Sequence, residues 1–499
     1  MPKRKRAKPQ KDCPDLIKAR DSWGRGRFTE ALRRFDKAVR RQPDHAGALS
    51  DAARAYGARF QVEKAKTIIA RLERVTGQAS DQLVEVAQIY DLCRRPDEAA
   101  RCLHLTLAHH PDHADANYEM ARLLEEQGDL TPAREHAERA LHSAPESDRA
   151  KILHARLLSK LGDNDYAYAI LIELSEPGVR PLVRGEALSM LAGIHESEGE
   201  FDEAFETMMA SNAALERIST KARDEAEVLE PVLGQLRQSV EQAQLKKWAR
   251  IQTDPELESP PLALMTAPYC SGANQVGELL SSQAGFAISN NVGVFSDEIF
   301  PAALLAGEDT GNSKTTELFN GLDHVRRRTE AQRYRELLIQ CLPDNRARPD
   351  RLIDNSPSIV PLIPSFLRIV PDGKVIVPLR DPRDILVSSL FAHFEPERDT
   401  VALSHPFDAT EKINFELGTW LHFREMLDPD QWQELRYEAV IENPTTAIAD
   451  ALEWLGSVEH RPALPPPADP PQSRWKHYES HLRPYFDELE PLLEPLGYA

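Results

Sequence analysis

The sequence predicts a protein of two parts: an all-α solenoid of short helical repeats, followed by an α/β domain with a central parallel sheet. Two observations carry this prediction. Alanine recurs every 34 residues through the N-terminal part, and the C-terminal part shows short apolar runs that lead through tight turns into helices. The chain has 499 residues, enough for a multidomain protein, since an ordinary domain takes about 150 residues.

The repeats show two registers of alanine. The first register comprises Ala19, Ala53, Ala87, Ala121 and Ala155. The second register comprises Ala31, Ala65, Ala99, Ala133 and Ala167. Two helices that cross closely need a small residue on each, so every unit is predicted to be a pair of amphipathic helices, with Pro43, Pro111 and Pro145 ending three units. The pattern resembles the tetratricopeptide repeat, and we predict about six repeats in the array.

Changes in composition set the predicted boundaries. Residues 1–11 hold six Lys/Arg and no acid, which predicts a basic disordered tail. Residues 12–218 form the repeat array, 219–260 a capping helix and connector, and 261–499 the α/β domain. Acidic residues outnumber basic ones 80 to 61, for a net charge of −19, so we expect no binding of nucleic acid, which needs concentrated positive charge.

The cysteines and the hydropathy indicate a compartment. Five cysteines at irregular spacing suggest neither a disulfide framework nor a metal site, and their odd number fits a reducing compartment, so we predict a cytoplasmic protein without a metal. No apolar run approaches 18 residues, so no membrane span is expected.

Two strand–turn–helix units occur in the C-terminal part. In residues 261–283 an apolar run turns through Pro-Tyr-Cys-Ser-Gly into helical spacing. Residues 373–394 repeat this plan, with a buried strand predicted over Lys374–Leu379. Such units aim backbone N–H groups and a positive helix end at a phosphate.

The second unit adds side chains that suit a phosphate. Arg380 leaves the end of the strand, and Ser388 follows eight residues later on the helix. A guanidinium can clamp a phosphate through two hydrogen bonds while a hydroxyl adds a third. The alternative is that Arg380 pairs with Asp384 and that Ser388 packs against the sheet.

Four ordered motifs make residues 262–490 similar to the sulfotransferase family, and the whole chain similar to bacterial proteins that join tetratricopeptide repeats to a sulfotransferase domain. The motifs are Arg380-Asp-Pro-Arg-Asp through Ser388, Leu421-His-Phe-Arg424, Arg436-Tyr-Glu-Ala-Val440, and Ser473-Arg-Trp-Lys-His-Tyr478. The resemblance implies that 3′-phosphoadenosine 5′-phosphosulfate is the co-substrate. It further implies that Arg380, Ser388 and Arg474 bind its 3′-phosphate, and that Tyr437 lies near the adenine.

The loop expected to hold the 5′-phosphosulfate departs from the family pattern Pro-Arg/Lys-Ser-Gly-Thr-Thr. Ser271 and Gly272 match, whereas Cys270 replaces the basic residue, and Ala273 and Asn274 replace the threonines. We expect Ser271 to Asn274 to bind the donor through their backbone. Cys270 has no base placed for it and is interpreted as a structural thiol.

Glu298 is the predicted catalytic base. It matches a glutamate that bacterial repeat-containing and tyrosyl-protein sulfotransferases carry after the first helix, where it would accept the proton of the acceptor hydroxyl. Asn355 stands where the family often has a lysine or a histidine, and it cannot act as a base. The alternative is that Glu298 or Asp297 caps the following helix.

The predicted function is therefore transfer of a sulfuryl group to a hydroxyl acceptor. The repeats are expected to bind a protein or peptide, and the alternatives are that they brace the neighbouring domain or form a homodimer. The arginine-rich stretch Asp323–Arg335 would attract an acidic acceptor, unless it is a solvated helix face. The competing function is a catalytically impaired, sulfotransferase-like protein that acts as an interaction scaffold.

Overall fold

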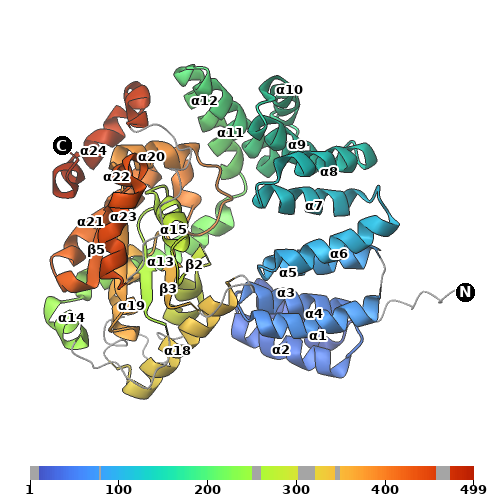
Figure 1. The fold of residues 1–499 in the computed structure, drawn as a ribbon, viewed down its shortest axis with the longest axis horizontal. Helices are drawn as coiled ribbons and strands as arrows, with labels where there is room; N and C mark the ends of the chain where they lie inside the picture. The colour runs from blue at the N-terminus through green and yellow to red at the C-terminus, as the bar shows by residue number, and fades with distance from the viewer. Residues whose placement is uncertain are drawn as a thin grey trace, which may run out of the picture. The chain divides into compact units, whose positions relative to one another are not determined.

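The computed structural model divides into two compact units, shown in Figure 1. One consists of Met1–Asp163 with Gln340–Asn345, and the other of Asn164–Ile339 with Arg346–Ala499. The residues that the structure describes are 11–77, 80–249, 260–290, 292–301, 321–342, 349–456 and 473–498. The division follows packing rather than repeat periodicity, so the domain boundaries drawn from the sequence stay a prediction.

Two predicted segments lie outside or almost outside the described residues. These are the basic tail, of which only Lys11 is described, and the proline-rich run at 462–472, whose composition predicts an extended linker.

The first unit is built from helices that alternate as first and second helix of successive repeats (Figure 1). Their bounds are α1 Pro14–Gly24, α2 Phe28–Arg41, α3 Ala46–Ala58, α4 Val62–Thr76, α5 Ser80–Leu92, α6 Pro96–His109, α7 Ala114–Glu126, α8 Leu130–Ser143 and α9 Asp148–Lys160. The all-α solenoid predicted from the alanine spacing is confirmed.

The alanines of both registers are buried as the periodicity requires. Each of the ten is at most 2% exposed. The first register falls on α1, α3, α5, α7 and α9, and the second on the helices that follow them. Space is equally short at Gly57, where an added Cβ would lie 2.8 Å from Cys93 Sγ. Small residues are therefore needed where the helices approach each other.

A third 34-residue register sets the turn between the two helices of a repeat. These turns contain residues with positive φ, namely Gly26, Phe60, Arg94, Gly128 and Gly162. The left-handed conformation is strained for any residue with a Cβ, so glycine is the natural choice. Because two of the five are not glycine, the sequence alone did not indicate this register.

The second unit begins with five helices. They are α10 Asn164–Leu174, α11 Pro181–Ser197, α12 Phe201–Glu216, α13 Thr220–Ser239 and α14 Gln242–Ala249. α11 and α12 continue the helical-pair pattern, with Ala192 and Ala204 both fully buried. α13 and α14 occupy the segment predicted to be a helical connector. Among the described residues, no helix is both long and apolar enough to cross a membrane.

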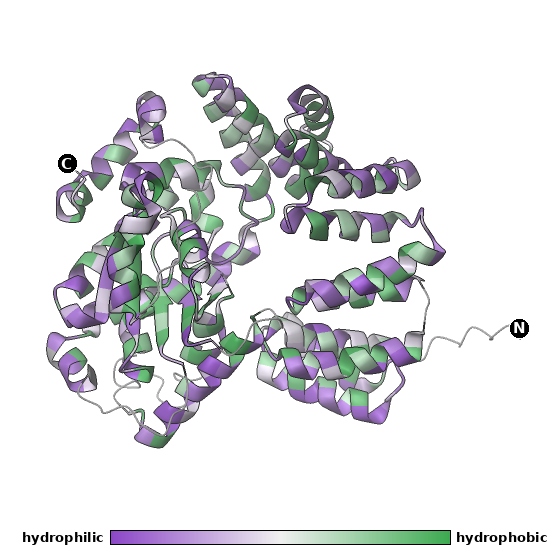
Figure 2. Ribbon diagram, viewed as in Figure 1, coloured by the Kyte–Doolittle hydropathy of each residue, from purple (hydrophilic) through white to green (hydrophobic). Residues whose placement is uncertain are grey.

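The rest of the second unit surrounds a five-stranded, all-parallel sheet in the order β2-β3-β1-β4-β5. The strands are β1 Leu262–Met265, β2 Phe286–Asn290, β3 Arg351–Asn355, β4 Lys374–Leu379 and β5 Trp432–Arg436. The strand predicted over Lys374–Leu379 is observed with those bounds. In Figure 2 green ribbon occurs in the interior of the second unit, around the sheet. The central strands β1 and β4 are buried along almost their whole length, as expected of strands covered on both faces.

Helices cover both faces of the sheet (Figure 1). The remaining described helices are α15 Ala273–Ser281, α18 His324–Gln340, α19 Ile363–Ile369, α20 Pro382–Phe391, α21 Pro406–Arg424, α22 Tyr437–Glu442, α23 Pro444–Trp454 and α24 Glu479–Leu496. Shorter turns are η1 Phe295–Ile299, η2 Val360–Leu362, η3 Val401–Ser404, η4 Pro429–Gln431 and η5 Arg474–Tyr478. Residues of α15, α22 and α23 share one apolar core with β1 to β5.

Tyr437 follows the last residue of β5, Arg436, and is the first residue of α22. The physical result is that the Tyr437 ring packs at a helix start beside the turn after β1, where it is 1% exposed.

Candidate functional site

The turn between β1 and α15 is fixed by its backbone and by one tyrosine ring. Cys270 and Gly272 both have positive φ, +65° and +91°. A Cβ on Gly272 would lie 2.3 Å from a ring carbon of Tyr437, so only glycine fits there. Ser271 Oγ donates a hydrogen bond to the carbonyl oxygen of Pro268. Ala273 begins the helix, whose first N–H groups have no partner within it and suit an anion.

Cys270 is held in this turn as a neutral thiol. Burial raises the pKa of the Cys270 thiol, and the opposing fields of Arg380 and Arg474 do not cancel that effect. Its backbone carbonyl accepts a hydrogen bond from Arg380 Nη1 at 3.1 Å. A protonated thiol is neither a nucleophile nor a substitute for a cation, which agrees with its interpretation as structural.

Arg380 is a buried cation without a carboxylate partner among the described residues. It is 4% exposed, and its guanidinium lies over the ring of Tyr437 at 4.5 Å from the centroid. Its Nη1 donates to the Cys270 carbonyl, whereas its Nε and Nη2 have no hydrogen-bond partner in the described part of the chain. Burying an unpaired charge is costly, so this arrangement fits a site that receives an anion.

The predicted alternative partner of Arg380 is engaged elsewhere. The Asp384 carboxylate accepts hydrogen bonds from the backbone N–H groups of Ser473 at 3.0 Å and Trp475 at 2.8 Å. These bonds attach η5 to α20. On the same helix Ser388 is 8% exposed, and its Oγ has no hydrogen-bond partner within the described ranges. Ser388 thus resembles Arg380 in offering a buried, unsatisfied polar group.

Arg474 is buried on η5 and already has a carboxylate partner. Its Nε and Nη2 donate to the two carboxylate oxygens of Glu196, on α11, at 2.5 and 2.6 Å. Its guanidinium lies over the ring of Phe391, at the end of α20, 4.4 Å from the centroid. The charges of Arg380 and Arg474 both lower the pKa of the Cys270 thiol, against the larger effect of burial. The fold therefore brings these two cations to the same loop, although 94 residues separate them.

Asparagine side chains meet at the carboxyl ends of the strands. Asn355 Nδ2 donates to Asn290 Oδ1 at 3.0 Å and to Asn274 Oδ1 at 3.3 Å. Asn355 is fully buried, and its Oδ1 has no partner among the described residues. Asn274 and Asn355 are candidate residues from the sequence, whereas Asn290 is not, because only the parallel register of β2 with β3 places it beside Asn355.

Glu298 lies within the π-helical turn η1. It is 9% exposed, and its carboxylate forms an ion pair with Arg333 on α18. Arg333 Nη1 also donates to the backbone carbonyl of Glu298 at 3.2 Å. The side chain is therefore oriented by a cation from the arginine-rich stretch.

Several arginines of that stretch are buried or make contacts within the fold. Arg333 pairs with Glu298 as described. Arg335 is 6% exposed and donates to the carbonyl oxygens of Pro260 and Ala331 at 3.3 and 3.2 Å. Arg327 is 5% exposed. Arg327 and Arg335 are thus turned into the fold, while Arg326, Arg328 and Arg333 are partly exposed, and attraction of an acidic acceptor by the stretch stays a prediction.

Acidic residues gather close to the loop on the segment after α20. Arg398 pairs with Asp297 at 3.2 Å and with Asp399 at 2.9 Å. Burial, followed by the charge of Asp399, raises the pKa of the neighbouring Tyr269 phenol. Burial and nearby carboxylates, Asp297 among them, also raise the pKa of Glu397. This network connects the loop to η1, where Glu298 lies.

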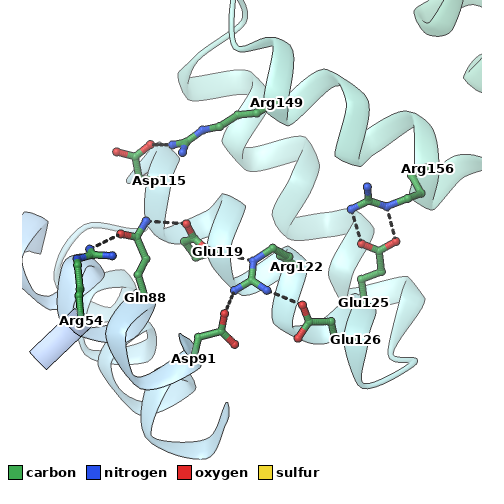
Figure 3. Close-up of polar contacts among 10 residues, drawn as sticks. All are labelled: Arg54, Gln88, Asp91, Asp115, Glu119, Arg122, Glu125, Glu126, Arg149 and Arg156. Carbon is green, nitrogen blue, oxygen red and sulfur yellow. Dashed lines mark hydrogen bonds and ion pairs between the residues drawn. The ribbon is translucent and has the colours of Figure 1, made fainter. Parts of the chain in front are cut away.

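The first helices of the repeats carry a second group of polar side chains. Figure 3 draws Arg54, Gln88, Asp91, Asp115, Glu119, Arg122, Glu125, Glu126, Arg149 and Arg156. Most partners in this network are 31 or 34 residues apart, so the bonds join equivalent helices of adjacent repeats. We call this set of ten residues the polar ladder.

The charges of the polar ladder neutralise one another. Arg122 contacts three carboxylates, those of Asp91 at 2.5 Å, Glu126 at 2.5 Å and Glu119 at 3.2 Å (Figure 3). The Glu125 carboxylate receives two bonds from Arg156, both 2.8 Å long. These contacts lower the pKa of Glu125 against the opposing effect of its burial. The shared face of the first helices is thus polar and internally paired.

Family models match segments in both parts of the chain. Residues 272–459 match the model of the Sulfotransferase family, and residues 22–83 and 94–157 match the tetratricopeptide repeat. The first match includes Glu298, Arg380, Ser388 and Tyr437, and ends before Arg474. No curated protein matches the chain.

Similar solved structures are repeat proteins. MamA is 15% identical over 38% of this chain and 93% of its own, with a TM-score of 0.27. A tetratricopeptide repeat protein from Parabacteroides merdae is 16% identical over 42% and 86%, with a TM-score of 0.33. PilF of Pseudomonas aeruginosa is 14% identical over 41% and 90%, with a TM-score of 0.32. These scores carry no argument, and the repeat assignment rests on the family match.

Proposed function

The chain joins tetratricopeptide repeats to a sulfotransferase family domain, and from this premise we propose that it transfers a sulfuryl group from 3′-phosphoadenosine 5′-phosphosulfate to a hydroxyl acceptor. The observation that carries the proposal is Arg380, a buried cation whose Nε and Nη2 lack partners in the described part of the chain. A phosphate group at this position would satisfy both nitrogens and balance the charge.

The other donor contacts follow from their position around the same loop. Ser388 Oγ would add a hydrogen bond to the 3′-phosphate, and Arg474 a second charge. The backbone from Ser271 to Asn274, at the start of α15, would receive the 5′-phosphosulfate. Tyr437, whose ring closes over Gly272 and Arg380, would border the adenine side. No metal is needed, because cationic side chains and helix N–H groups can stabilise the charge on the leaving phosphate.

In this proposal Glu298 accepts the proton of the acceptor hydroxyl as the hydroxyl oxygen bonds to the sulfur. The bond from sulfur to the donor's phosphate oxygen breaks, and adenosine 3′,5′-bisphosphate leaves. Its pairing with Arg333 fixes the carboxylate in one orientation. Acidic residues on the Arg398 segment favour an acceptor that is neutral or positively charged around its hydroxyl, rather than the acidic peptide suggested by the arginine-rich stretch.

The second candidate function is a scaffold with little or no activity. The observation in its favour is Cys270, a neutral thiol at the place where the family carries a cation. Losing one transition-state charge contact can lower the rate by about 100-fold or more. In that case the repeats, which we propose bind a protein or peptide segment, would carry the function. None of the five cysteines is in a disulfide, which supports the proposed cytoplasmic location.

Calorimetric titration with adenosine 3′,5′-bisphosphate tests the donor site. The wild-type chain should bind, and Arg380→Ala should lose about 2–3 kcal/mol, or roughly 100-fold in affinity, as expected for hydrogen bonds to a charged group. Arg483→Ala is the matched control, since Arg483 lies on α24 with its side chain 64% exposed.

The outcomes separate the two candidate functions. Binding together with transfer of label from radiolabelled donor supports the enzyme. Binding without transfer to any of a panel of hydroxyl compounds and peptides supports the impaired protein. Absence of binding by the wild-type chain contradicts the donor site itself.

A further inference from the structure

The second cation of the proposed donor site is held from outside the sulfotransferase match. Arg474 follows the matched residues 272–459, and its partner Glu196 precedes them on α11, a helix of the repeat-like pairs. Both residues belong to the same compact unit. The contact is a two-point ion pair with bonds of 2.5 and 2.6 Å. This is the most strongly defined charge contact in the neighbourhood of the loop.

The carboxylate of Glu196 engages one side of the guanidinium. Glu196 occupies the side formed by Nε and Nη2, while the fork has five N–H groups in one plane. The end formed by Nη1 and the second hydrogen of Nη2 remains directed away from Glu196. A carboxylate bound in this way fixes the plane of the guanidinium, so the remaining N–H groups point in one direction.

Aromatic contacts restrict the pair further. The guanidinium lies against the ring of Phe391, and Tyr478 Oη donates to Glu196 Oε1 at 3.0 Å. The side chain of Arg474 is 8% exposed and that of Glu196 22%. Both side chains are therefore largely shielded from water, where an ion pair is worth more than on an open surface.

Stacked aromatic rings join the elements next to the ion pair. The rings of Phe201, at the start of α12, and His477 stack at 4.0 Å with an interplanar angle of 12°. Phe205 and His481 stack in the same manner at 4.4 Å and 19°. These contacts join the helix that follows Glu196 to the segment that follows Arg474, so the ion pair is part of a packed interface and not a chance encounter of long side chains.

We propose that Glu196 is a positioning residue of the donor site, which orients Arg474 toward the 3′-phosphate of the donor. The inference rests on the proposed function and extends it, because it makes a helix of the repeat-like region a necessary part of nucleotide binding. Glu196 occupies the Nε and Nη2 side of the Arg474 fork, so in this proposal the phosphate binds at the Nη1 end, where it does not have to displace the carboxylate.

A comparison of two nucleotides on the full chain tests the proposal. Calorimetry is done with adenosine 3′,5′-bisphosphate and with adenosine 5′-monophosphate, which lacks the 3′-phosphate. Glu196→Gln should weaken binding of the bisphosphate by about tenfold or more, the usual effect of removing a residue that orients a binding group. Binding of the monophosphate should be unchanged. Glu198→Gln is the matched control, since Glu198 is an exposed carboxylate two residues further along the chain.

Each outcome decides the question. A loss confined to the bisphosphate in Glu196→Gln, with Glu198→Gln equal to wild type, supports the positioning role. An equal loss with both nucleotides marks a general structural effect and overturns it. Unchanged or tighter bisphosphate binding overturns it as well. If the wild-type chain binds the two nucleotides equally, the proposed 3′-phosphate site fails first, and this result is distinct from the others.

Discussion

Several charged side chains of the second unit are buried, and they differ in whether they have a partner of opposite charge. Arg380 has no carboxylate partner among the described residues, whereas Arg474 and Glu298 each have one. A buried cation that pairs internally has its charge compensated within the fold, whereas one that does not pair is available for a ligand. Under the proposed function, Arg380 and Arg474 would therefore have different roles toward the same phosphate, one as a direct clamp and one that needs an orienting partner.

Kinetics should show whether Glu298 is the base. Glu298→Gln keeps a hydrogen-bond acceptor for Arg333 but removes proton acceptance, so kcat should fall by about 10²- to 10⁴-fold while bisphosphate affinity stays the same. Asp297→Asn is the matched control on the preceding residue, which pairs with Arg398 instead. A large loss in Asp297→Asn alone would move the catalytic role to that residue.

Asp354 makes stability depend on pH. Burial raises the pKa of Asp354 to about 6 from 3.8, although its carboxylate accepts hydrogen bonds from Tyr334 at 2.5 Å and Ser356 at 2.7 Å. Between pH 3.8 and about 6 the folded protein binds more protons at this site than the unfolded chain. Stability from this group is therefore lost as pH rises through that window, by about 3 kcal/mol in total.

Asp354→Asn should remove that loss. The unfolding free energy of the variant, relative to wild type, should increase by up to about 3 kcal/mol from pH 4 to pH 7, measured by urea denaturation. Tyr334→Phe is a second test variant. Losing the hydrogen bond from Tyr334 should raise the pKa of Asp354 further, so stability should be lost over a window that reaches higher pH than in wild type. Parallel curves for wild type and Asp354→Asn would contradict the raised pKa.

Among the elements, the turns of the repeats need a left-handed backbone, which strains a residue with a Cβ and which glycine adopts freely. Five turn residues spaced by 34 adopt positive φ, and glycine fills three of these places. At Gly128 an added Cβ would meet nothing within 4 Å, so a substitution there changes backbone strain and little else. The position isolates the conformational role of glycine from packing.

Gly128→Ala should therefore lower the unfolding free energy by about 1 kcal/mol, the cost of the left-handed conformation for a residue with a Cβ. Gly234→Ala is the matched control, because Gly234 lies inside α13 with equally open space around its Cα and with ordinary helical φ. It should raise stability by about 0.5–1 kcal/mol, since alanine favours helix. Thermal midpoints that move in the same direction for both variants would contradict this reasoning.

At the scale of the whole molecule, the repeats are connected by charge as well as by apolar packing. A repeat array gains its stability from contacts between neighbours, and the polar ladder adds such contacts between first helices. Arg122 is its centre, with three carboxylates around a side chain that is 24% exposed. The nearby carboxylates raise the pKa of Arg122, against burial.

Arg122→Met should destabilise the array by about 2–3 kcal/mol, because it keeps the aliphatic volume but leaves carboxylates close together without their cation. Arg139→Met is the control, since the Arg139 side chain is 51% exposed and pairs with Glu135 at 3.4 Å. That variant should change stability by less than about 0.5 kcal/mol. Equal losses would mean that the ladder contributes no more than a surface ion pair.

Local sequence patterns were enough to predict the solenoid, the α/β architecture and the residues of the family motifs. Two alanine registers were enough for the solenoid, because burial at helix crossings forces small residues to recur with the repeat. The strand at Lys374–Leu379 and the α/β architecture followed from apolar runs and turn residues in the same way. The residues that bear the family motifs, Arg380 and Ser388 among them, could also be picked out, since they lie within one strand–turn–helix unit.

Only the tertiary structure decided which charges are paired. That Arg474 is held by Glu196, Glu298 by Arg333, and Asn355 by Asn290 depends on contacts between segments 35 to 278 residues apart. Sequence periodicity reports which face of an element is buried, but it does not report which partner that face meets. Pairing depends on how the elements are packed, and it is the pairing that distinguishes the unpartnered Arg380 from its neighbours in the described part of the chain.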